Sequence, residues 1–318
     1  MVALCHYGLV TEAWTLAGMV KESNGEITVK EIRAVGDDEQ ASVVASLDRL
    51  KRFSGHSLMG ALTDARNDLM RHLYTDADDA SVALSTAEFR SKFGAKLSHW
   101  LTTFTGFRRQ MENLIALVNV PWLTAVQENF ETVYRKHPEY RLTWQLRNLD
   151  QHDPPASAAV SFRSASDRPG LMAVIDLPRL FTDRTANNDR DSAQWRACQA
   201  LWAGQEIVEF AQVVHLAYLA CETIMGAAVH DVELRLIEDI GRLTKLYAEV
   251  VGSGAPCLIR TEPIVVPKGM NMQLLQIDLL AIGEAIVTVN GARRILGQPE
   301  IDVKTDPRFG PDLSAYFS

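Results

Sequence analysis

The spacing of apolar residues changes several times along this chain. The first part of the chain combines a strand pattern with helix patterns. Residues 26–32 (EITVKEI) follow the turn-like sequence ESNG and predict a short strand. The acidic segment GDDEQ separates this strand from residues 41–53, whose apolar positions recur at helical spacing. Residues 56–74 predict a second helix, which ends near the polar sequence TDADDAS.

From Ser85 onward the pattern becomes strongly helical. Residues 85–119 carry apolar side chains at steps of three and four, which predicts a continuous apolar stripe along one long helix. The stripe consists of Phe89, Phe93, Leu97, Leu101, Phe104 and Phe107. Pro121 and Pro138 each predict the start of a further helix, because the missing N–H of proline is harmless in a first turn.

After Pro155 the pattern mixes strands and helices. Residues 158–165 and 170–177 predict two short strands joined by the turn SDRPG. Residues 192–229 and 232–252 each predict a long helix. Two or three final strands are predicted in residues 256–267, 272–282 and 284–291.

These elements predict a mainly α fold: a helical bundle with short β elements before, within and after it, α+β overall. We expect three parts. Residues 1–84 mix strand and helix, residues 85–252 form the helical bundle, and residues 253–318 form a short β-rich tail that packs on the bundle. A chain of 318 residues is long enough for one large domain or two small ones.

Composition narrows the class of protein. With 47% hydrophobic and 23% charged residues, the chain is typical of soluble globular proteins. A net charge of −8 argues against nucleic-acid binding through many phosphate contacts, but it is compatible with a small local binding site. Neither a secretory signal nor a run of about 20 apolar residues is present, so we expect a cytoplasmic protein.

The sequence predicts neither a metal nor an organic cofactor. Its four cysteines (Cys5, Cys198, Cys221 and Cys257) are scattered, and none forms a CxxC pair, so reduced thiols are expected. Phosphate-binding GxxxxGK[ST] and dinucleotide-binding GxGxxG sequences are absent. Because His215 and Cys221 lie in an apolar helix, we expect a core histidine and a buried thiol rather than a metal site or a cysteine nucleophile.

Residues 140–155 (YRLTWQLRNLDQHDPP) combine an apolar helix face with a polar one. Three leucines recur at spacings of four and three, which indicates a buried face. Roughly opposite lie Trp144, Arg147 and Gln151, with Asn148 beside them and His152 one turn above Asn148. A tryptophan among polar residues suggests a second contact surface, such as a partner subunit.

The end of this helix carries residues suited to phosphate chemistry. Asp153 precedes a proline, so the helix should stop near His152. The partial negative charge of a helix carboxyl end favours a protonated histidine but repels a phosphate, so Arg147 would have to supply a forked cationic donor. A proton carrier and a cationic clamp are the minimum for metal-free cleavage by an RNA 2′-hydroxyl. The alternative is a solvated helix end on which His152 is a capping cation.

The segment LRNLDQH resembles the R-x4–6-H motif of the HEPN superfamily, in which Asn, Asp or His often follows the arginine. Two apolar helices before the motif, a proline-rich exit, short strands and two later helices are similar to the layout of bacterial HEPN-like proteins. The resemblance spans roughly residues 85–250. It implies a metal-independent endoribonuclease, often a toxin or antiphage effector, whose composite site forms between two subunits. Many relatives are inactive binding or scaffold modules.

The resemblance also implies roles for individual residues. Arg147 would bind the scissile phosphate, His152 would act as general base or acid, and Asn148 would orient one of them. The products would carry a 2′,3′-cyclic phosphate and a 5′-hydroxyl. The expected partners are RNA, a second copy of the chain, and an antitoxin or defence-system protein.

Further residues are candidates for RNA contact. Gln151 and Trp144 share the polar helix face. Arg108 and Arg109 lie one turn from Glu112, so they either form an exposed ion pair within their helix or line an RNA groove.

A second segment matches the same pattern. Arg66, Asn67 and His72 have R-x5-H spacing, and either this segment is the relevant motif or it belongs to a surface helix.

Overall fold

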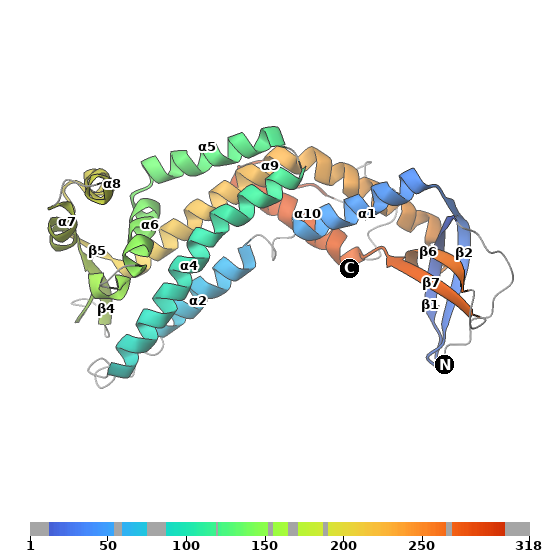
Figure 1. Ribbon diagram of the computed structural model, residues 1–318, viewed down its shortest axis with the longest axis horizontal. Coiled ribbons are helices and arrows are strands. Elements are labelled where there is room, and N and C mark those ends of the chain that lie inside the picture. The colour runs from blue at the N-terminus through green and yellow to red at the C-terminus, as the bar shows by residue number, and fades with distance from the viewer. Residues whose placement is uncertain are drawn as a thin grey trace. The chain divides into compact units, whose positions relative to one another are not determined.

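The computed structural model describes residues 13–53, 59–74, 87–118, 120–151, 155–164, 171–186, 190–264 and 269–302. The chain divides into two compact units. Residues 1–55 and 229–318 form the first unit, and residues 56–228 form the second. The helix α9 (Phe210–Val250) contributes residues to both units (Figure 1).

The first unit contains a four-stranded antiparallel sheet with the strand order β2-β1-β6-β7 (Figure 1). Its strands are β1 (Trp14–Lys21), β2 (Ile27–Val35), β6 (Ala255–Ile264) and β7 (Gly269–Gln276). Because β1 pairs with β6, the N-terminal and C-terminal parts of the chain build one sheet together. The domain boundaries expected at residues 84 and 252 are therefore wrong.

The sheet confirms one predicted strand and adds another. All but the first residue of the predicted strand 26–32 lie within β2, after a turn in which Gly25 has a φ of 85°. The strand β1 was not predicted, because its sequence WTLAGMVK does not alternate between apolar and polar residues. Within β1, a Cβ atom added to Gly18 would lie 2.0 Å from the carbonyl oxygen of Ser253, so a side chain at this position would displace backbone.

Two helices of the first unit differ from their predictions. The helix α1 (Asp37–Arg52) includes in its first turn most of the acidic segment expected to precede it, because carboxylates are stabilised at a helix N-terminus. Residues 284–291 were predicted as a strand but lie within α10 (Leu279–Ile295). Asp278 caps α10 by accepting a hydrogen bond from the Leu280 N–H at 2.9 Å. The buried side chains of α10 then recur at helical spacing, which overrides the β-branched local sequence.

A buried carboxylate ties α1 to α9 within the first unit. The side chain of Asp239 is fully buried and accepts two hydrogen bonds from Arg49, at 2.6 and 2.7 Å. Ser46 donates a third at 2.8 Å, and Arg242 donates both to Ser46 and to Asp239. The hydrogen bonds to Asp239 raise the pKa of Arg49 above its usual value. The carboxylate is stable inside the protein because all of these donors surround it.

The second unit contains the long amphipathic helix that the sequence predicts. Its first four helices are α2 (Ala61–Tyr74), α4 (Ala87–Val118), α5 (Val120–Lys136) and α6 (Pro138–Asp150). All six stripe residues predicted for α4 are buried. The helix α4 contacts α2, α5 and α6, and the helix starts predicted at Pro121 and Pro138 are confirmed to within one residue.

A small antiparallel sheet follows α6. It has the strand order β3-β4-β5, and short helices flank its strands (Figure 1). These elements are η2 (Ala156–Ala159), β3 (Val160–Ser164), β4 (Leu171–Asp176), α7 (Leu177–Thr185), α8 (Arg190–Gln199), η3 (Ala200–Trp202) and β5 (Ile207–Glu209). The strands predicted in residues 158–165 and 170–177 are confirmed as β3 and β4. The predicted breaks TDADDAS and SDRPG lie outside the described residues.

The two long helices predicted after this sheet are divided differently in the structure. The prediction of one helix over residues 192–229 is wrong, because the chain turns after η3, at Gly204 with a φ of 84°. It then forms β5 before α9 begins. The predicted gap before residue 232 is absent, since α9 continues to Val250. The fold class itself is confirmed as mainly α with small sheets.

Among the described residues, α9 is long and apolar enough to cross a membrane by length and composition. From the sequence, we expected no segment that could cross a membrane. However, 61% of the most apolar stretch of α9 is buried within the chain. Such burial is typical of the core helix of a soluble protein.

We expect Asp239→Ala to lower the free energy of unfolding by about 3–5 kcal/mol, because it leaves Arg49 buried without its anion. Urea denaturation followed by circular dichroism measures this difference. The matched control is Asp48→Ala, which removes an exposed pair with Arg52 at 2.9 Å and should cost at most about 0.5 kcal/mol. Equal losses for the two variants would contradict the structural role of Asp239.

Candidate functional site

The helix α6 presents one buried face and one partly exposed face. Pro138 occupies its first turn, and Leu142, Leu146 and Leu149 are all buried, as the sequence predicts. This apolar face packs against α4 and α5, which contact α6 within the second unit. The packing fixes the direction in which the last turn of α6 points its polar residues.

Arg147 and Asn148 lie on this last turn and are both partly exposed. Neither side chain forms a hydrogen bond or an ion pair within the part of the chain that the structure describes. Gln151 is exposed at the C-cap. His152 lies outside the described residues. Of the predicted arginine–histidine pair, the structure therefore describes only Arg147.

The guanidinium of Arg147 is well placed to bind an anion. Its five N–H donors form a planar fork that matches two oxygens of a phosphate. The partial negative charge of the nearby carbonyl groups at the helix end stabilises the cation. The amide of Asn148 adds both a donor and an acceptor beside it.

The helix pattern predicted that Trp144 faces away from the core, but in the structure it does not. Its half-buried ring lies 6.3 Å from the rings of Phe104 and Tyr134, and 6.4 Å from the stacked ring of Tyr140. Tyr140 and Trp144 are four residues apart, so their side chains meet on one face of α6. Trp144 is therefore part of an aromatic cluster inside the chain, which leaves less of it available to a partner.

Arg108 is engaged by carboxylates within the second unit. Its guanidinium donates to Glu112 at 2.9 Å and to Glu131 of α5 at 3.1 Å, and it lies over the ring of Phe130. Burial lowers the pKa of Arg108, but the hydrogen bonds to the two glutamates outweigh this effect and raise it. The predicted pairing of Arg108 with Glu112 is confirmed. Arg109 is exposed, so of the two arginines it is the more accessible to a ligand.

The second R-x5-H segment is not a surface site. His72 is 2% exposed, and its ring stacks on Phe89 with 4.5 Å between the ring centroids. A ring nitrogen lies 3.3 Å from the carbonyl oxygen of Phe89. A side chain buried in this way is not accessible to a ligand. Arg66, Asn67 and His72 therefore do not form a catalytic motif together.

Arg66 instead contacts a histidine of α9 that is remote in sequence. Its Nη2 atom lies 2.9 Å from Nδ1 of His215, and its guanidinium lies 4.8 Å from the ring centroid of Tyr218. Since arginine only donates, Nδ1 of His215 is the acceptor of this hydrogen bond. His215 is exposed, so its prediction as a core histidine is wrong. The spacing of His215 and Tyr218 could have indicated a shared helix face, but only the fold shows that Arg66 of α2 contacts both side chains.

Within the described ranges, no three His, Cys, Asp or Glu side chains are grouped to hold a metal ion. Cys221 is buried, as predicted, and so are Cys198 and Cys257. Cys5 lies outside the described residues.

Comparisons with protein-family models, with curated proteins and with solved structures find no match to this chain. The resemblance to the HEPN superfamily therefore rests on the motif and on the helical layout around it.

We expect the three described cysteines to resist alkylation in the folded protein. Burial raises the pKa of Cys198 to about 12 and that of Cys257 to about 11, and it raises the pKa of Cys221 well above its usual value. Since the reactive species is the thiolate, iodoacetamide at about pH 8 should modify them only after denaturation. Peptide mass spectrometry measures each site. Rapid modification of native Cys221 would show that its thiol is accessible.

Proposed function

We propose that this chain is a metal-independent endoribonuclease of the HEPN type, which cuts RNA through a composite site made by two copies of α6. Its proposed setting is the cytoplasm, as a toxin or antiphage effector controlled by an antitoxin or another defence-system protein. The burial of α9 supports a soluble location.

One observation carries this proposal: Arg147 is a partly exposed guanidinium without a partner among the described residues, next to Asn148 and a few residues before His152 in the sequence. Arg108 and Arg49, in contrast, are paired with carboxylates. A phosphate that binds Arg147 displaces no ion pair, so its binding energy is not reduced by breaking one.

The proposed reaction needs only side chains of the protein. His152 takes the proton of the RNA 2′-hydroxyl, and the 2′-oxygen attacks the adjacent phosphorus. The bond to the 5′-oxygen breaks, and this oxygen receives a proton from an imidazolium, either that of the same His152 or that of its copy in the partner. Arg147 stabilises the charge on the non-bridging oxygens, and Asn148 orients the reacting groups. The products are a 2′,3′-cyclic phosphate and a 5′-hydroxyl.

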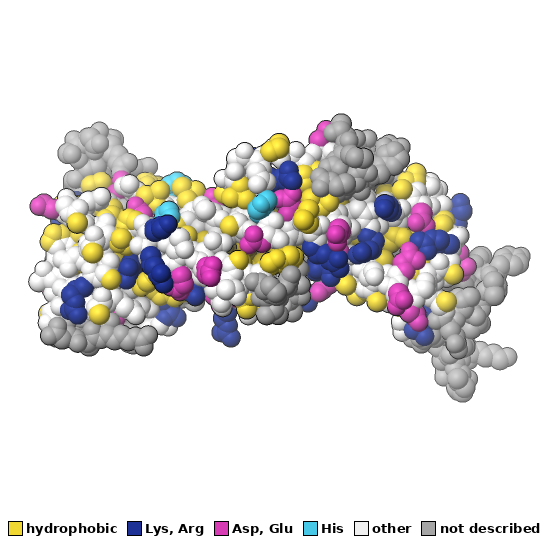
Figure 2. Space-filling view, turned by 90° about the horizontal axis from the view of Figure 1, so that it is seen from above, with side chains coloured by type: hydrophobic (Ala, Val, Ile, Leu, Met, Phe, Trp, Pro, Cys, Tyr) yellow, Lys and Arg dark blue, Asp and Glu magenta, His cyan; other side chains and the backbone are white. Residues whose placement is uncertain are grey.

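A catalytically inactive interaction module is the alternative. Two observations favour it. Arg108 is bound to Glu112 and Glu131 and is not available to RNA. On the face of the molecule in Figure 2, basic side chains are interspersed with acidic ones. In this alternative the same helix face binds a second copy or a partner protein without chemistry.

We expect the purified protein to cleave total RNA in EDTA, and Arg147→Ala and His152→Ala each to reduce the rate by at least about 100-fold, since each removes a group that acts in the transition state. Gel analysis and end-labelling measure the rate and the cyclic phosphate product. The matched control is Arg135→Ala, which removes an exposed arginine of α5 in the same unit and should keep wild-type activity.

If both alanine variants retain wild-type cleavage, the proposal of catalysis through this motif is wrong. An inactive wild-type protein that still forms a dimer would favour the interaction module.

We expect Asn148→Arg to weaken the dimer by at least about tenfold, because it places further positive charges beside Arg147 and its copy at the two-fold axis. Sedimentation equilibrium measures the dissociation constant. Asn67→Arg makes the same change at an exposed position of α2 and should leave the dimer unchanged. An unaffected Asn148→Arg dimer would place the interface elsewhere.

A further inference from the structure

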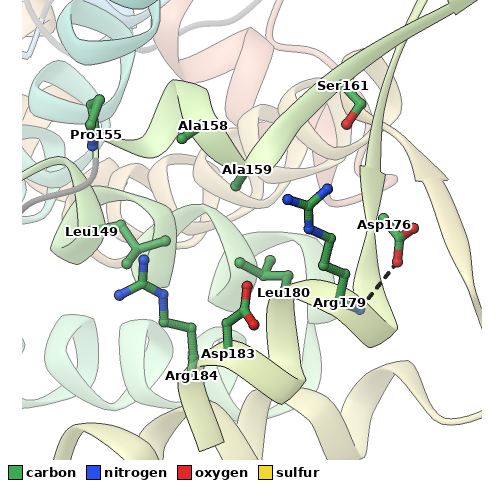
Figure 3. Close-up of a pocket in the computed structure, with 10 residues that line it drawn as sticks. All are labelled: Leu149, Pro155, Ala158, Ala159, Ser161, Asp176, Arg179, Leu180, Asp183 and Arg184. Carbon is green, nitrogen blue, oxygen red and sulfur yellow. Dashed lines mark hydrogen bonds between the residues drawn. The ribbon is translucent and has the colours of Figure 1, made fainter.

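A pocket of about 180 Å³ lies between the end of α6, η2 and one face of α7 (Figure 3). Its upper wall is apolar and includes Leu149, Pro155 and Ala158. Its lower wall comes from α7 and its N-cap Asp176, and the lining residues recur at spacings of three and four, so they share one helix face. The lining residues of α7 are Arg179, Leu180, Asp183 and Arg184.

Two guanidinium groups face this pocket. Figure 3 shows the side chains of Arg179 and Arg184 rising from α7 toward η2, with the carboxylate of Asp183 between them. Neither guanidinium forms an ion pair or a hydrogen bond with any residue that the structure describes. The Nε atom of Arg184 is shielded from solvent, as are those of Arg66, Arg141 and Arg260, so its terminal Nη groups are the donors available to a ligand.

The charges around the pocket favour an anion. Asp176 accepts a hydrogen bond from the backbone N–H of Arg179 at 3.1 Å, and Arg163 lies 3.6 Å from its other oxygen. The charge of Asp176 is therefore already balanced. The groups left unbalanced are the guanidinium groups of Arg179 and Arg184 and the carboxylate of Asp183. Their net charge is +1.

We propose that this pocket binds the phosphate group of a small phosphorylated ligand, with Arg179 and Arg184 as its two clamps. A phosphate monoester has three terminal oxygens, enough for two guanidinium forks, whereas a carboxylate has two. A pocket of this volume has room for several water molecules. A phosphate with a few further atoms therefore fits.

Asp183 sets the protonation state of the bound group. A phosphate monoester loses its second proton near pH 6. The neighbouring carboxylate repels the dianion, and it accepts a hydrogen bond from the hydroxyl of the monoanion. Removing the charge of Asp183 therefore strengthens the binding of the dianion.

This binding does not depend on RNA cleavage, so the inference goes beyond the proposed nuclease function. Leu149 and Pro155, which both line the pocket, flank the segment that carries His152. Binding with wild-type affinity by Arg147→Ala separates the pocket from the proposed catalytic site.

Isothermal titration calorimetry of the full chain at pH 8 tests the proposal with inorganic phosphate, AMP, adenosine and acetate as separate probes. We expect phosphate and AMP to bind and adenosine and acetate not to bind. Arg179→Gln and Arg184→Gln should each weaken phosphate binding by about 10- to 100-fold, as expected for a charge-assisted hydrogen bond. Asp183→Asn should bind phosphate more tightly than wild type, a change that misfolding cannot produce.

Arg135→Gln is the matched control and should bind as wild type does. Several results would overturn the proposal: no binding of phosphate or AMP up to about 10 mM, equal binding of acetate, or unchanged binding by both arginine variants. If AMP binds much more tightly than phosphate and the arginine variants weaken both ligands, the natural ligand is a nucleotide. If the two bind equally, the pocket recognises the phosphate alone.

Discussion

The packing of α6 against α4 and α5 is the constraint on which the candidate site depends. Tyr140, Leu142 and Leu146 are each at most 2% exposed, and each such side chain contributes about 1.5–3 kcal/mol through burial. Burial also raises the pKa of Tyr140 well above its usual value, which keeps its hydroxyl neutral. A helix anchored along this face cannot rotate about its axis without exposing these residues. The last turn must therefore direct Arg147 and Asn148 toward the surface.

The arginines considered for ligand binding in the second unit differ in whether they have carboxylate partners. Arg108 has carboxylate partners, and a ligand that recruits it must first separate charges that already attract each other. Arg147, Arg179 and Arg184 have no such partner among the described residues, so a phosphate adds an interaction without removing one. Sequence spacing does not show this difference. Arg108 meets Glu112 within its own helix, but its second partner, Glu131, is on α5.

Local patterns predicted the parts of the fold that local physics determines. The stripe of α4, the proline starts of α5 and α6 and the strands β2, β3 and β4 all follow from periodicity or turn chemistry. The failures share a tertiary cause. The pairing of β1 with β6 joins residues about 240 positions apart, and α10 is a helix despite the sequence IVTV because its buried face is helical. At the candidate site, the polar turn of α6 was predictable. The inward turn of Trp144, the contact of Arg66 with His215 and the arginine pocket of α7 were not, because each needs an element remote in sequence.

The charge of the protein limits how either candidate site can work. A net charge of −8 opposes the long-range attraction of a polyanion, so a bound RNA or nucleotide gains little from the molecule as a whole. Recognition must then come from a few guanidinium forks in fixed positions, each facing one phosphate. Such binding releases few counterions, so its affinity depends only weakly on salt, unlike that of proteins with broad basic surfaces. Geometry, more than charge density, must therefore select the ligand, and in this chain that geometry comes from packed helices such as α6.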